Sequence, residues 1–243
     1  MTDSIQISVV VPVKDEAGNV VPLAREIAVA LTGERCEIIF VDDGSSDATA
    51  AELLTLKGQM PLRVVAHGKN LGQSRALRTG VRAAKAELVV TLDGDGQNDP
   101  ADIPKLIAAF RSAAIDPAFA MVAGERTKRQ DSWRKRIASR VGNGVRQWLL
   151  KDNAKDTGCG LKAFRREAFL ALPYFDHMHR YLITLMLREG YQVRFMAVGH
   201  RPRGAGRSKY GVWDRALVGL ADLIGVMWLK RRFRGPDSPR ELR

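Results

Sequence analysis

Short apolar runs alternate with longer amphipathic stretches along the first half of the chain. The apolar runs are rich in Val and Ile, which favour strands, and they cover residues 7–13, 37–41, 62–66, 87–92 and 119–123. The stretches between them have the apolar spacing of helices and cover residues 19–31, 46–57, 72–85 and 101–113. This alternation predicts an α/β fold with a mostly parallel central sheet and helices on both faces.

The pattern weakens after residue 125. Helices are predicted over 131–150 and 178–189, a strand over 191–198, and a last helix from Trp213. We therefore expect one catalytic or binding domain over 1–210, followed by a C-terminal amphipathic helix and basic tail over 211–243.

Three acidic turns follow predicted strands. They read KDEAGN (14–19), DDGSSD (42–47) and DGDGQND (93–99). Parallel sheets bind ligands at the carboxyl ends of their strands, so these turns predict the site. The chain has neither a GxGxxG nor a Walker A pattern, which disfavours dinucleotide and P-loop chemistry.

The third turn carries candidate metal ligands. Asp93 and Asp95 are two residues apart, so in extended chain their carboxylates point the same way. Mg²⁺ or Mn²⁺ prefers such oxygen ligands, and the amide oxygen of Gln97 can complete the shell. A polar turn that ends a strand is the alternative. The second acidic turn favours the metal interpretation.

Cysteine usage and the first residues bear on location. Cys36 and Cys159 are far apart and form no CxxC motif, so neither a disulfide framework nor a zinc site is expected. The N-terminal residues lack the pattern of a signal peptide. We expect a cytoplasmic protein.

The formal net charge of +12 is concentrated in two blocks. Residues 126–151 hold nine Lys or Arg and one acid, and residues 200–243 hold eleven and four. A solvated face and nucleic acid are the rival explanations. No aromatic interleaving or zinc-finger pattern accompanies the basic residues. We therefore expect anionic lipid headgroups or phosphate-bearing substrates, and no nucleic acid.

The C-terminal helix has one apolar stripe in this pattern. The stripe comprises Leu217, Leu220, Ile224, Met227 and Trp228. Arg215 and Asp222 fall on the opposite face, and four basic residues follow. The apolar stretch 216–229 is shorter than the roughly 20 residues that a membrane span needs. It predicts a helix lying on an anionic membrane surface, with packing against the domain or against a second copy in a homo-oligomer as the alternatives.

The motifs together resemble a known family. VVVPVKDE (9–16) with Asn19, VDDGSSD (41–47), Asn70-Leu71-Gly72 with Ala76, and LDGDGQ (92–97) resemble family 2 inverting glycosyltransferases of the GT-A fold. Gly124-Glu125-Arg126, Ser139 to Asn143, DTGCGLKAF (156–164) and Arg203-Gly206-Ser208-Lys209 resemble the polyprenyl-phosphate branch, which includes dolichol-phosphate mannose synthase. The match spans residues 5–212.

This resemblance implies a metal-dependent enzyme that moves a sugar from a UDP- or GDP-sugar to an undecaprenyl- or dolichyl-type phosphate. It would act as a peripheral protein on the cytosolic membrane face. The implied nucleotide-binding residues are Pro12, Lys14, Glu16, Asp42, Asp43, Asn70, Gly72, Ala76 and Asp93. For Asp42 and Asp43, turn formation and capping of the helix from Ser46 are the alternative. Lys14 and Asp15 stand where many relatives have an aromatic residue and Asn.

The acceptor calls for cations rather than a base. A lipid monophosphate is largely ionised at pH 7, with a second pKa of about 6, so it needs only positive charges that offset repulsion from the diphosphate. The resemblance assigns this task to Arg126, Lys135, Ser139, Arg203 and Lys209. Asp156 stands where other family 2 enzymes keep an acceptor base. Here it either orients a cation or stabilises its loop.

The sequence leaves alternatives open for the segment 200–210, for Asp156 and for the function as a whole. The segment 200–210 is predicted to be a lid that orders over phosphates, or else a static surface loop. A family 2 enzyme with a polysaccharide or other non-lipid acceptor would use Asp156 as its base. A non-catalytic basic binding protein is the third hypothesis, and the Asp93, Asp95 and Gln97 set argues against it.

Overall fold

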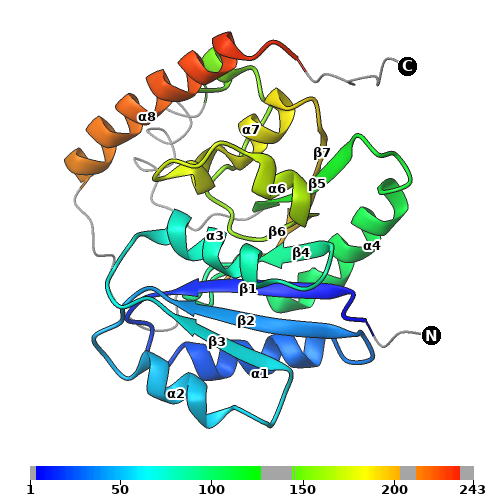
Figure 1. Ribbon diagram of the computed structural model, residues 1–243, viewed down its shortest axis with the longest axis vertical. Coiled ribbons are helices and arrows are strands. Elements are labelled where there is room, and N and C mark those ends of the chain that lie inside the picture. Colours follow the sequence, from blue (N-terminus) through cyan, green and yellow to red (C-terminus); the bar gives the residue numbers. More distant parts are fainter. Residues whose placement is uncertain (1–3, 127–143, 145, 203–211, 236–243) are drawn as a thin grey trace, which may run out of the picture.

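The computed structural model describes residues 4–126, 144, 146–202 and 212–235. Within them, a seven-stranded sheet has the order β3-β2-β1-β4-β6-β5-β7 (Figure 1). The strands are β1 (Ile7–Val13), β2 (Cys36–Asp42), β3 (Leu62–Ala66), β4 (Leu88–Thr91), β5 (Phe119–Arg126), β6 (Lys162–Arg165) and β7 (Gln192–Val198). The predicted α/β class is confirmed.

Most strand pairs are parallel. Strand β1 pairs in parallel with β2 and β4, β2 with β3, and β5 with β7. Strand β6 is antiparallel to both β4 and β5, and the sequence did not predict it. Its four residues begin with a lysine and end with an arginine, so they lack the apolar pattern of a buried strand.

Helices cover both faces of the sheet. They are α1 (Val20–Ala30), α2 (Thr49–Thr55), α3 (Gln73–Ala83), α4 (Ile103–Ala113), α6 (Arg166–Ala171), α7 (Leu182–Arg188) and α8 (Val212–Arg232), with 3₁₀ turns η1 (Pro100–Asp102) and η2 (Met178–Tyr181). Apolar side chains of α1, α2 and α4 join one core cluster, and those of α3, α6, α7 and α8 join the other. Strand alternation divides the sheet between them, since Val9 and Val11 belong to the first cluster and Val10 to the second.

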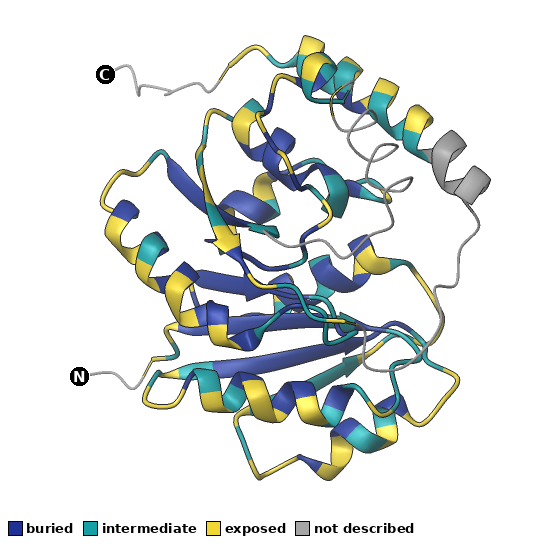
Figure 2. Cartoon of the chain, turned by 180° about the vertical axis from the view of Figure 1, so that it is seen from behind, coloured by how far each residue is buried: buried dark blue, intermediate teal, exposed yellow. Residues whose placement is uncertain are grey.

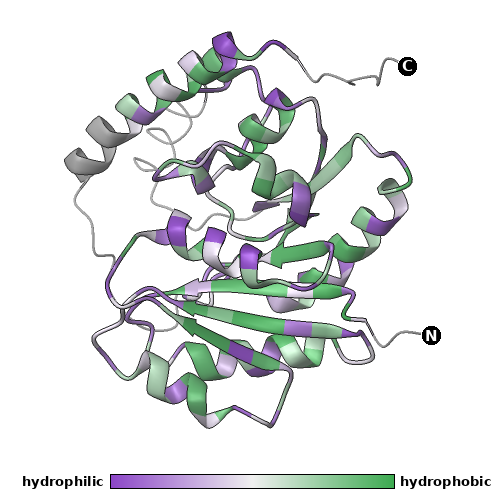
Figure 3. Ribbon diagram, viewed as in Figure 1, coloured by the Kyte–Doolittle hydropathy of each residue, from purple (hydrophilic) through white to green (hydrophobic). Residues whose placement is uncertain are grey.

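Ribbons coloured by burial and by hydropathy show the same layering (Figures 2 and 3). Strands β1, β2, β4 and β5 are mostly buried, whereas many residues on the outer sides of the helices are exposed and hydrophilic. Among the helices in the described ranges, none is both long and apolar enough to cross a bilayer.

The topology brings three chain segments to one edge. Lys162 at the start of β6 lies opposite Thr91 at the end of β4, and opposite Ala123 near the end of β5. The carboxyl ends of β1, β2 and β4 share this edge because those strands are parallel. The acidic turns and Arg126 therefore meet there.

Two predicted helices have different bounds in the structure. Helix α2 begins at Thr49 rather than at residue 46, because Ser45 and Ser46 are hydrogen-bonded to Asp42 and Asp15 in a turn. Of the helix predicted over 131–150, residues 146–150 are helical, and most of the remainder lies outside the described residues.

Candidate active site

Two glycines shape the turn that carries Asp93 and Asp95. A Cβ on Gly94 would lie 2.4 Å from Cγ1 of Val13, so only glycine allows this close approach to β1. Gly96 has a φ of +74°, a conformation that L side chains rarely adopt. The DGDG spacing thus folds into a tight turn directly after β4.

Asp93 is held from two sides. Its backbone N–H donates to Oδ1 of Asn98 at 3.0 Å, and its Oδ1 accepts from Nε2 of Gln73 at 2.9 Å. Burial and the charge of Asp95 raise the pKa of Asp93 to about 6, against the opposing charges of Lys162 and Arg126. Two carboxylates at one turn thus repel each other, and a divalent cation relieves that repulsion.

The surrounding donor atoms also fit a hard cation. Oδ1 of Asp95 accepts from the backbone N–H of Gln97 at 3.1 Å. His200 lies in a bridge opposite Asn98, and its buried Nδ1 has no hydrogen-bond partner in the described part of the chain. Within the described ranges, no group of three or more His, Cys, Asp or Glu side chains is arranged to hold a metal ion by itself. Two carboxylates and an amide oxygen suit Mg²⁺ or Mn²⁺, which take further ligands from water and substrate phosphates.

The acidic pair at the end of β2 organises the neighbouring turns. Asp43 is 4% exposed, and its carboxylate accepts from the backbone N–H groups of Leu71 and Gly72 at 2.9 and 2.8 Å, and contacts Nδ1 of His67 at 2.8 Å. Asp42 accepts from the backbone and side chain of Ser45. Asp43 therefore fixes the Asn70–Gly72 turn at the edge of the site. Neither carboxylate caps a helix.

The other predicted nucleotide-binding residues of the first turn lie at the same edge. Lys14 donates to the carbonyl of Gly44 at 3.0 Å and pairs with Asp15 at 3.2 Å. Glu16 accepts from Nδ2 of Asn19 at 2.7 Å, and Pro12 pairs with Val41 inside the sheet.

The predicted residues of the segment 70–76, after β3, lie in two different environments. Asn70 is exposed and accepts from the N–H of Gly72 through its own Oδ1 at 3.0 Å. Ala76 is fully buried in the core cluster under α3. Its small size serves the packing of α3 on the sheet rather than a contact surface.

Arg126 and Asp156 form a two-pronged ion pair. Nε and Nη2 of Arg126 donate to the two carboxylate oxygens of Asp156 at 2.6 and 2.7 Å, and the backbone N–H of Arg126 donates to Asp156 at 3.2 Å. Burial acts to lower the pKa of Arg126, but the hydrogen bonds and charge of Asp156 outweigh it and raise that pKa. Asp156 thus pairs with a cation, an arrangement that fits the first of the three roles the sequence left open: orienting a cation, stabilising its loop, or serving as an acceptor base.

The remaining predicted acceptor residues lie outside the described residues. These are Lys135, Ser139, Arg203 and Lys209, together with most of the segment 200–210.

Three site residues escaped the sequence analysis. Gln73 reaches Asp93 from the start of α3. A Cβ on Gly160 would lie 2.4 Å from Cγ of Asp93, so this glycine lets the 159–160 turn rest on the carboxylate. Lys162 is 4% exposed and donates to the carbonyl of Cys159. The motif DTGCGLKAF contained the last two residues, but only the β4–β6 register reveals their neighbours.

Helix α8 has two apolar faces rather than one stripe. Leu220, Ile224 and Trp228 are 56%, 61% and 57% exposed. Met227, predicted on the same stripe, instead packs with Leu223 and buried Val226 against the core cluster of α3 and α7. The predicted apolar stripe is therefore divided: its Met227 side packs against the domain, which the sequence left open as an alternative, and its Leu220, Ile224 and Trp228 side is exposed.

Asp222 of α8 was predicted on the face opposite the apolar stripe. In the structure its side chain is 17% exposed, in contrast to exposed Leu220 and Ile224, and its Oδ2 lies 3.1 Å from Nδ1 of His177. The neighbouring His179 contacts Ser74 of α3 through Nδ1 at 2.8 Å. These contacts connect α8, the loop before η2 and the start of α3.

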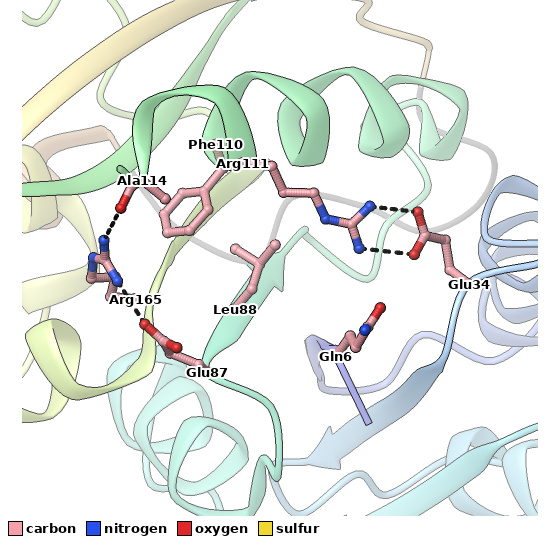
Figure 4. Close-up of a pocket in the computed structure, with 8 residues that line it drawn as sticks. All are labelled: Gln6, Glu34, Glu87, Leu88, Phe110, Arg111, Ala114 and Arg165. Carbon is pink, nitrogen blue, oxygen red and sulfur yellow. Dashed lines mark hydrogen bonds and ion pairs between the residues drawn. The ribbon is translucent and has the colours of Figure 1, made fainter. Parts of the chain in front are cut away.

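A second depression lies near the amino ends of β1, β2 and β4, away from the acidic turns. Its lining includes Leu88 and Phe110 between two ion pairs, Arg111 with Glu34 and Arg165 with Glu87 (Figure 4). Each arginine already faces a carboxylate, so this surface offers no free charge of either sign to a phosphate or a metal.

Comparison with known proteins identifies the family to which the chain belongs. The sequence pattern of the family described as Glycosyl transferase family 2 matches residues 8–172. The dodecaprenyl-phosphate galacturonate synthase of Rhizobium johnstonii is 33% identical over 94% of this chain and 68% of its own length. The undecaprenyl-phosphate 4-deoxy-4-formamido-L-arabinose transferase of Edwardsiella ictaluri is 36% identical over 91% and 66%. The chain thus spans about two thirds of these relatives.

Solved structures support the fold. The glucosyl-3-phosphoglycerate synthase from Mycobacterium tuberculosis, in complex with Mn²⁺, UDP and glucosyl-3-phosphoglycerate, superposes with a TM-score of 0.70 at 20% identity, over 96% of this chain and 81% of that one. The same enzyme with Mg²⁺ and UDP gives a TM-score of 0.69 at 19% identity, over 96% and 81%.

Proposed function

Because the chain belongs to glycosyltransferase family 2, we propose that it transfers a sugar from a nucleotide sugar to a polyprenyl phosphate, with inversion at the sugar carbon. The names of the relatives from Rhizobium and Edwardsiella support this acceptor class. The observation that carries the proposal is the ion pair of Arg126 with Asp156. Both carboxylate oxygens of Asp156, the candidate general base, accept hydrogen bonds from Arg126. This arrangement suits a phosphate acceptor, which needs no general base.

The reaction follows from the charges at this edge. A phosphate oxygen of the ionised acceptor attacks the anomeric carbon as the bond from that carbon to the donor diphosphate breaks. The nucleoside diphosphate leaves with the bonding electron pair. Arg126 lies where the carboxyl ends of β4 and β5 meet, so its charge can hold the attacking phosphate. The predicted cations Lys135, Arg203 and Lys209, with Ser139, would complete that acceptor site.

The acidic turns supply the donor side. We assign Asp93, Asp95 and Gln97 to a Mg²⁺ or Mn²⁺ ion, and Lys14, Glu16, Asp42 and Asp43 with the Asn70–Gly72 turn to the nucleotide of a UDP- or GDP-sugar. When bound, the cation would offset the negative charge that develops on the leaving diphosphate. Gln73 and Asn98 hold Asp93 in place from two directions.

The acceptor class is tested by product analysis. A panel of UDP- and GDP-sugars is incubated with polyprenyl phosphate and Mn²⁺, and mass spectrometry identifies the products. A polyprenyl-phosphate sugar with loss of nucleoside diphosphate is the expected result. Sugar transfer to a glycan but never to the lipid would contradict the proposal.

Replacement of Asp156 discriminates between the two acceptor classes. If Asp156 orients Arg126, Asp156→Asn keeps transfer to lipid phosphate within about tenfold, since asparagine still accepts one hydrogen bond. If Asp156 is a general base, the same change costs about 10²- to 10⁴-fold. The rate of Asp156→Asn at saturating substrates decides between them.

We further propose that the protein is peripheral on the cytosolic face of an anionic membrane. The outward face of α8 (Leu220, Ile224 and Trp228) is exposed, and Lys230, Arg231, Arg232 and Arg234 follow it. Apolar side chains beside a basic cluster favour an anionic bilayer surface, which is also where a polyprenyl phosphate resides.

A further inference from the structure

Lys162 is a buried cation to which the proposed reaction gives no task. It opens β6 opposite Thr91 of β4 and is 4% exposed. Its ammonium donates to the carbonyl of Cys159, and it forms no ion pair with any carboxylate in the described ranges. A buried ammonium is costly unless charges nearby favour it. The charged groups near Lys162 therefore decide whether a buried ammonium is favoured at this position.

Three charged side chains act on the ammonium of Lys162, namely those of Asp93, Asp156 and Arg126. Burial lowers the pKa of Lys162, while the charges of Asp93 and Asp156 favour its ammonium form and that of Arg126 opposes it. Arg126 is hydrogen-bonded to Asp156 by two short contacts. Both Lys162 and Arg126 oppose the charge of Asp93, with Lys162 the stronger of the two.

The position of Lys162 also fixes the floor of the site. Thr91 donates to the carbonyl of Gly160 at 2.9 Å, and Lys162 donates to the adjacent carbonyl of Cys159. Gly160 rests against the carboxylate of Asp93. Because this turn covers Lys162, its ammonium does not contact a substrate directly. It acts on substrates through its electrostatic field and through its effect on Asp93.

We propose that Lys162 is a positioning residue whose fixed charge behind Asp93 and Asp95 weakens binding of a divalent cation by itself and favours its entry together with the nucleotide diphosphate. A positive charge repels the free cation but attracts the diphosphate, so the two bind best as a pair. The same charge adds to the field that stabilises the leaving diphosphate. This inference rests on the metal assignment in the proposed function.

The test is Mn²⁺ binding to the full chain without nucleotide, measured from the electron paramagnetic resonance signal of free Mn²⁺. Lys162→Met should bind Mn²⁺ about fivefold more tightly than wild type, as removal of a nearby like charge predicts. Its kcat should fall about tenfold, with little change in KM for the lipid. If Lys162 only held the turn, Asp93 would loosen and Mn²⁺ would bind more weakly. Unchanged or weaker Mn²⁺ binding overturns the proposal.

Two further variants separate charge from hydrogen bonding. Lys162→Gln removes the charge but keeps a donor for Cys159, so it should reproduce the tighter Mn²⁺ binding even if Lys162→Met is unstable. Lys162→Arg keeps the charge and should bind Mn²⁺ as wild type does. Asp95→Asn tests the metal assignment on which the inference rests, and it should abolish Mn²⁺ binding. Mn²⁺ binding that survives this change would refute the proposed metal site and, with it, the role of Lys162, whereas loss of binding in Asp95→Asn with unchanged binding in Lys162→Met would refute the role of Lys162 alone.

Discussion

At the scale of single residues, Asp95 is the most direct test of the metal assignment. It lies in a turn at the end of β4, not in the core. Asp95→Asn should remove Mn²⁺-dependent transfer by at least about 10²-fold while leaving the melting temperature nearly unchanged, since the loss falls on transition-state charge. Steady-state rates over a Mn²⁺ titration provide the measurement.

The matched control for this change is Asp116→Asn. Asp116 is an exposed acid in the turn before β5, where it accepts from Ala118 and Gln192 at the far end of the strand from Arg126. It should retain wild-type transfer. If Asp95→Asn works normally in the presence of EDTA, the metal assignment is wrong.

Gly160 is the basis of a second prediction at this scale, because the absence of a side chain there leaves room for the carboxylate of Asp93. A Cβ at this position would lie 2.4 Å from both Cγ and Oδ2 of Asp93. The carboxylate can swing away, so Gly160→Ala should fold with a nearly wild-type melting temperature but lose about tenfold or more in kcat, since misplacement by 1 Å can cost 10²-fold. Gly68→Ala, where a Cβ meets nothing within 4 Å, is the control.

A crystal structure of Gly160→Ala supplies the second readout. The carboxylate of Asp93 should rotate away from its position beside Gln73. Full activity in the alanine variant would show that the position of Asp93 is not critical for transfer.

At the scale of elements, the contact of η2 with α3 predicts a pH-dependent stability. Burial lowers the pKa of His179 to about 3, and the charges of Arg180, Lys162 and His177 add to this effect. Its neutral ring contacts Ser74 of α3. Below the unfolded pKa of about 6.5, the unfolded chain binds a proton that the folded chain refuses, so stability falls as the pH drops.

The expected decline is up to about 1.4 kcal/mol per pH unit below pH 6.5, ending near pH 3. Urea unfolding between pH 7 and pH 5 measures it above the range in which most carboxylates titrate. His179→Gln should be less stable at pH 7 yet show a shallower decline. Equal slopes for both proteins would show that His179 takes up its proton in the folded state.

The elements also show what the sequence can and cannot predict. Strand β1 begins and ends where its apolar run does, because a buried parallel strand is apolar on both faces. Strand β6 has no such pattern. Lys162 at its start lies opposite Thr91 of β4, and Arg165 at its end donates to the carbonyl of Phe119 on β5, so the residues that explain this strand are distant in sequence. The two faces of α8 were merged for the same reason, because which face packs depends on the domain beneath.

The site residues also differ in whether the sequence alone could identify them. Asp93, Asp95 and Gln97 were recognisable because one local turn holds all three. The pairing of Arg126 with Asp156 joins residues thirty apart, and the sequence left three roles open for Asp156 without choosing among them. That Gly160 and Lys162 belong to the site becomes evident only from the pairing of β6 with β4.

At the scale of the whole molecule, the outward face of α8 and the basic residues after it predict attachment to anionic membranes. Basic residues near such a surface contribute about 1 kcal/mol each, and salt screens that contribution. Burial of Leu220, Ile224 and Trp228 in the interface would add a part that salt does not remove. Wild type should therefore sediment with anionic vesicles and be released only in part at high salt.

The decisive comparison uses two double variants, each of which replaces two exposed apolar side chains by serine. Leu220→Ser with Ile224→Ser should lower vesicle binding at least about tenfold, without lowering the melting temperature, because both side chains are exposed. Val29→Ser with Leu54→Ser removes residues 75% and 56% exposed on α1 and α2, which cover the opposite face of the sheet, and should bind vesicles as wild type does. If both double variants bind alike, α8 does not contact the membrane. If wild type stays in the supernatant and elutes as a dimer that the α8 variant dissociates, the outward face joins two copies of the chain instead.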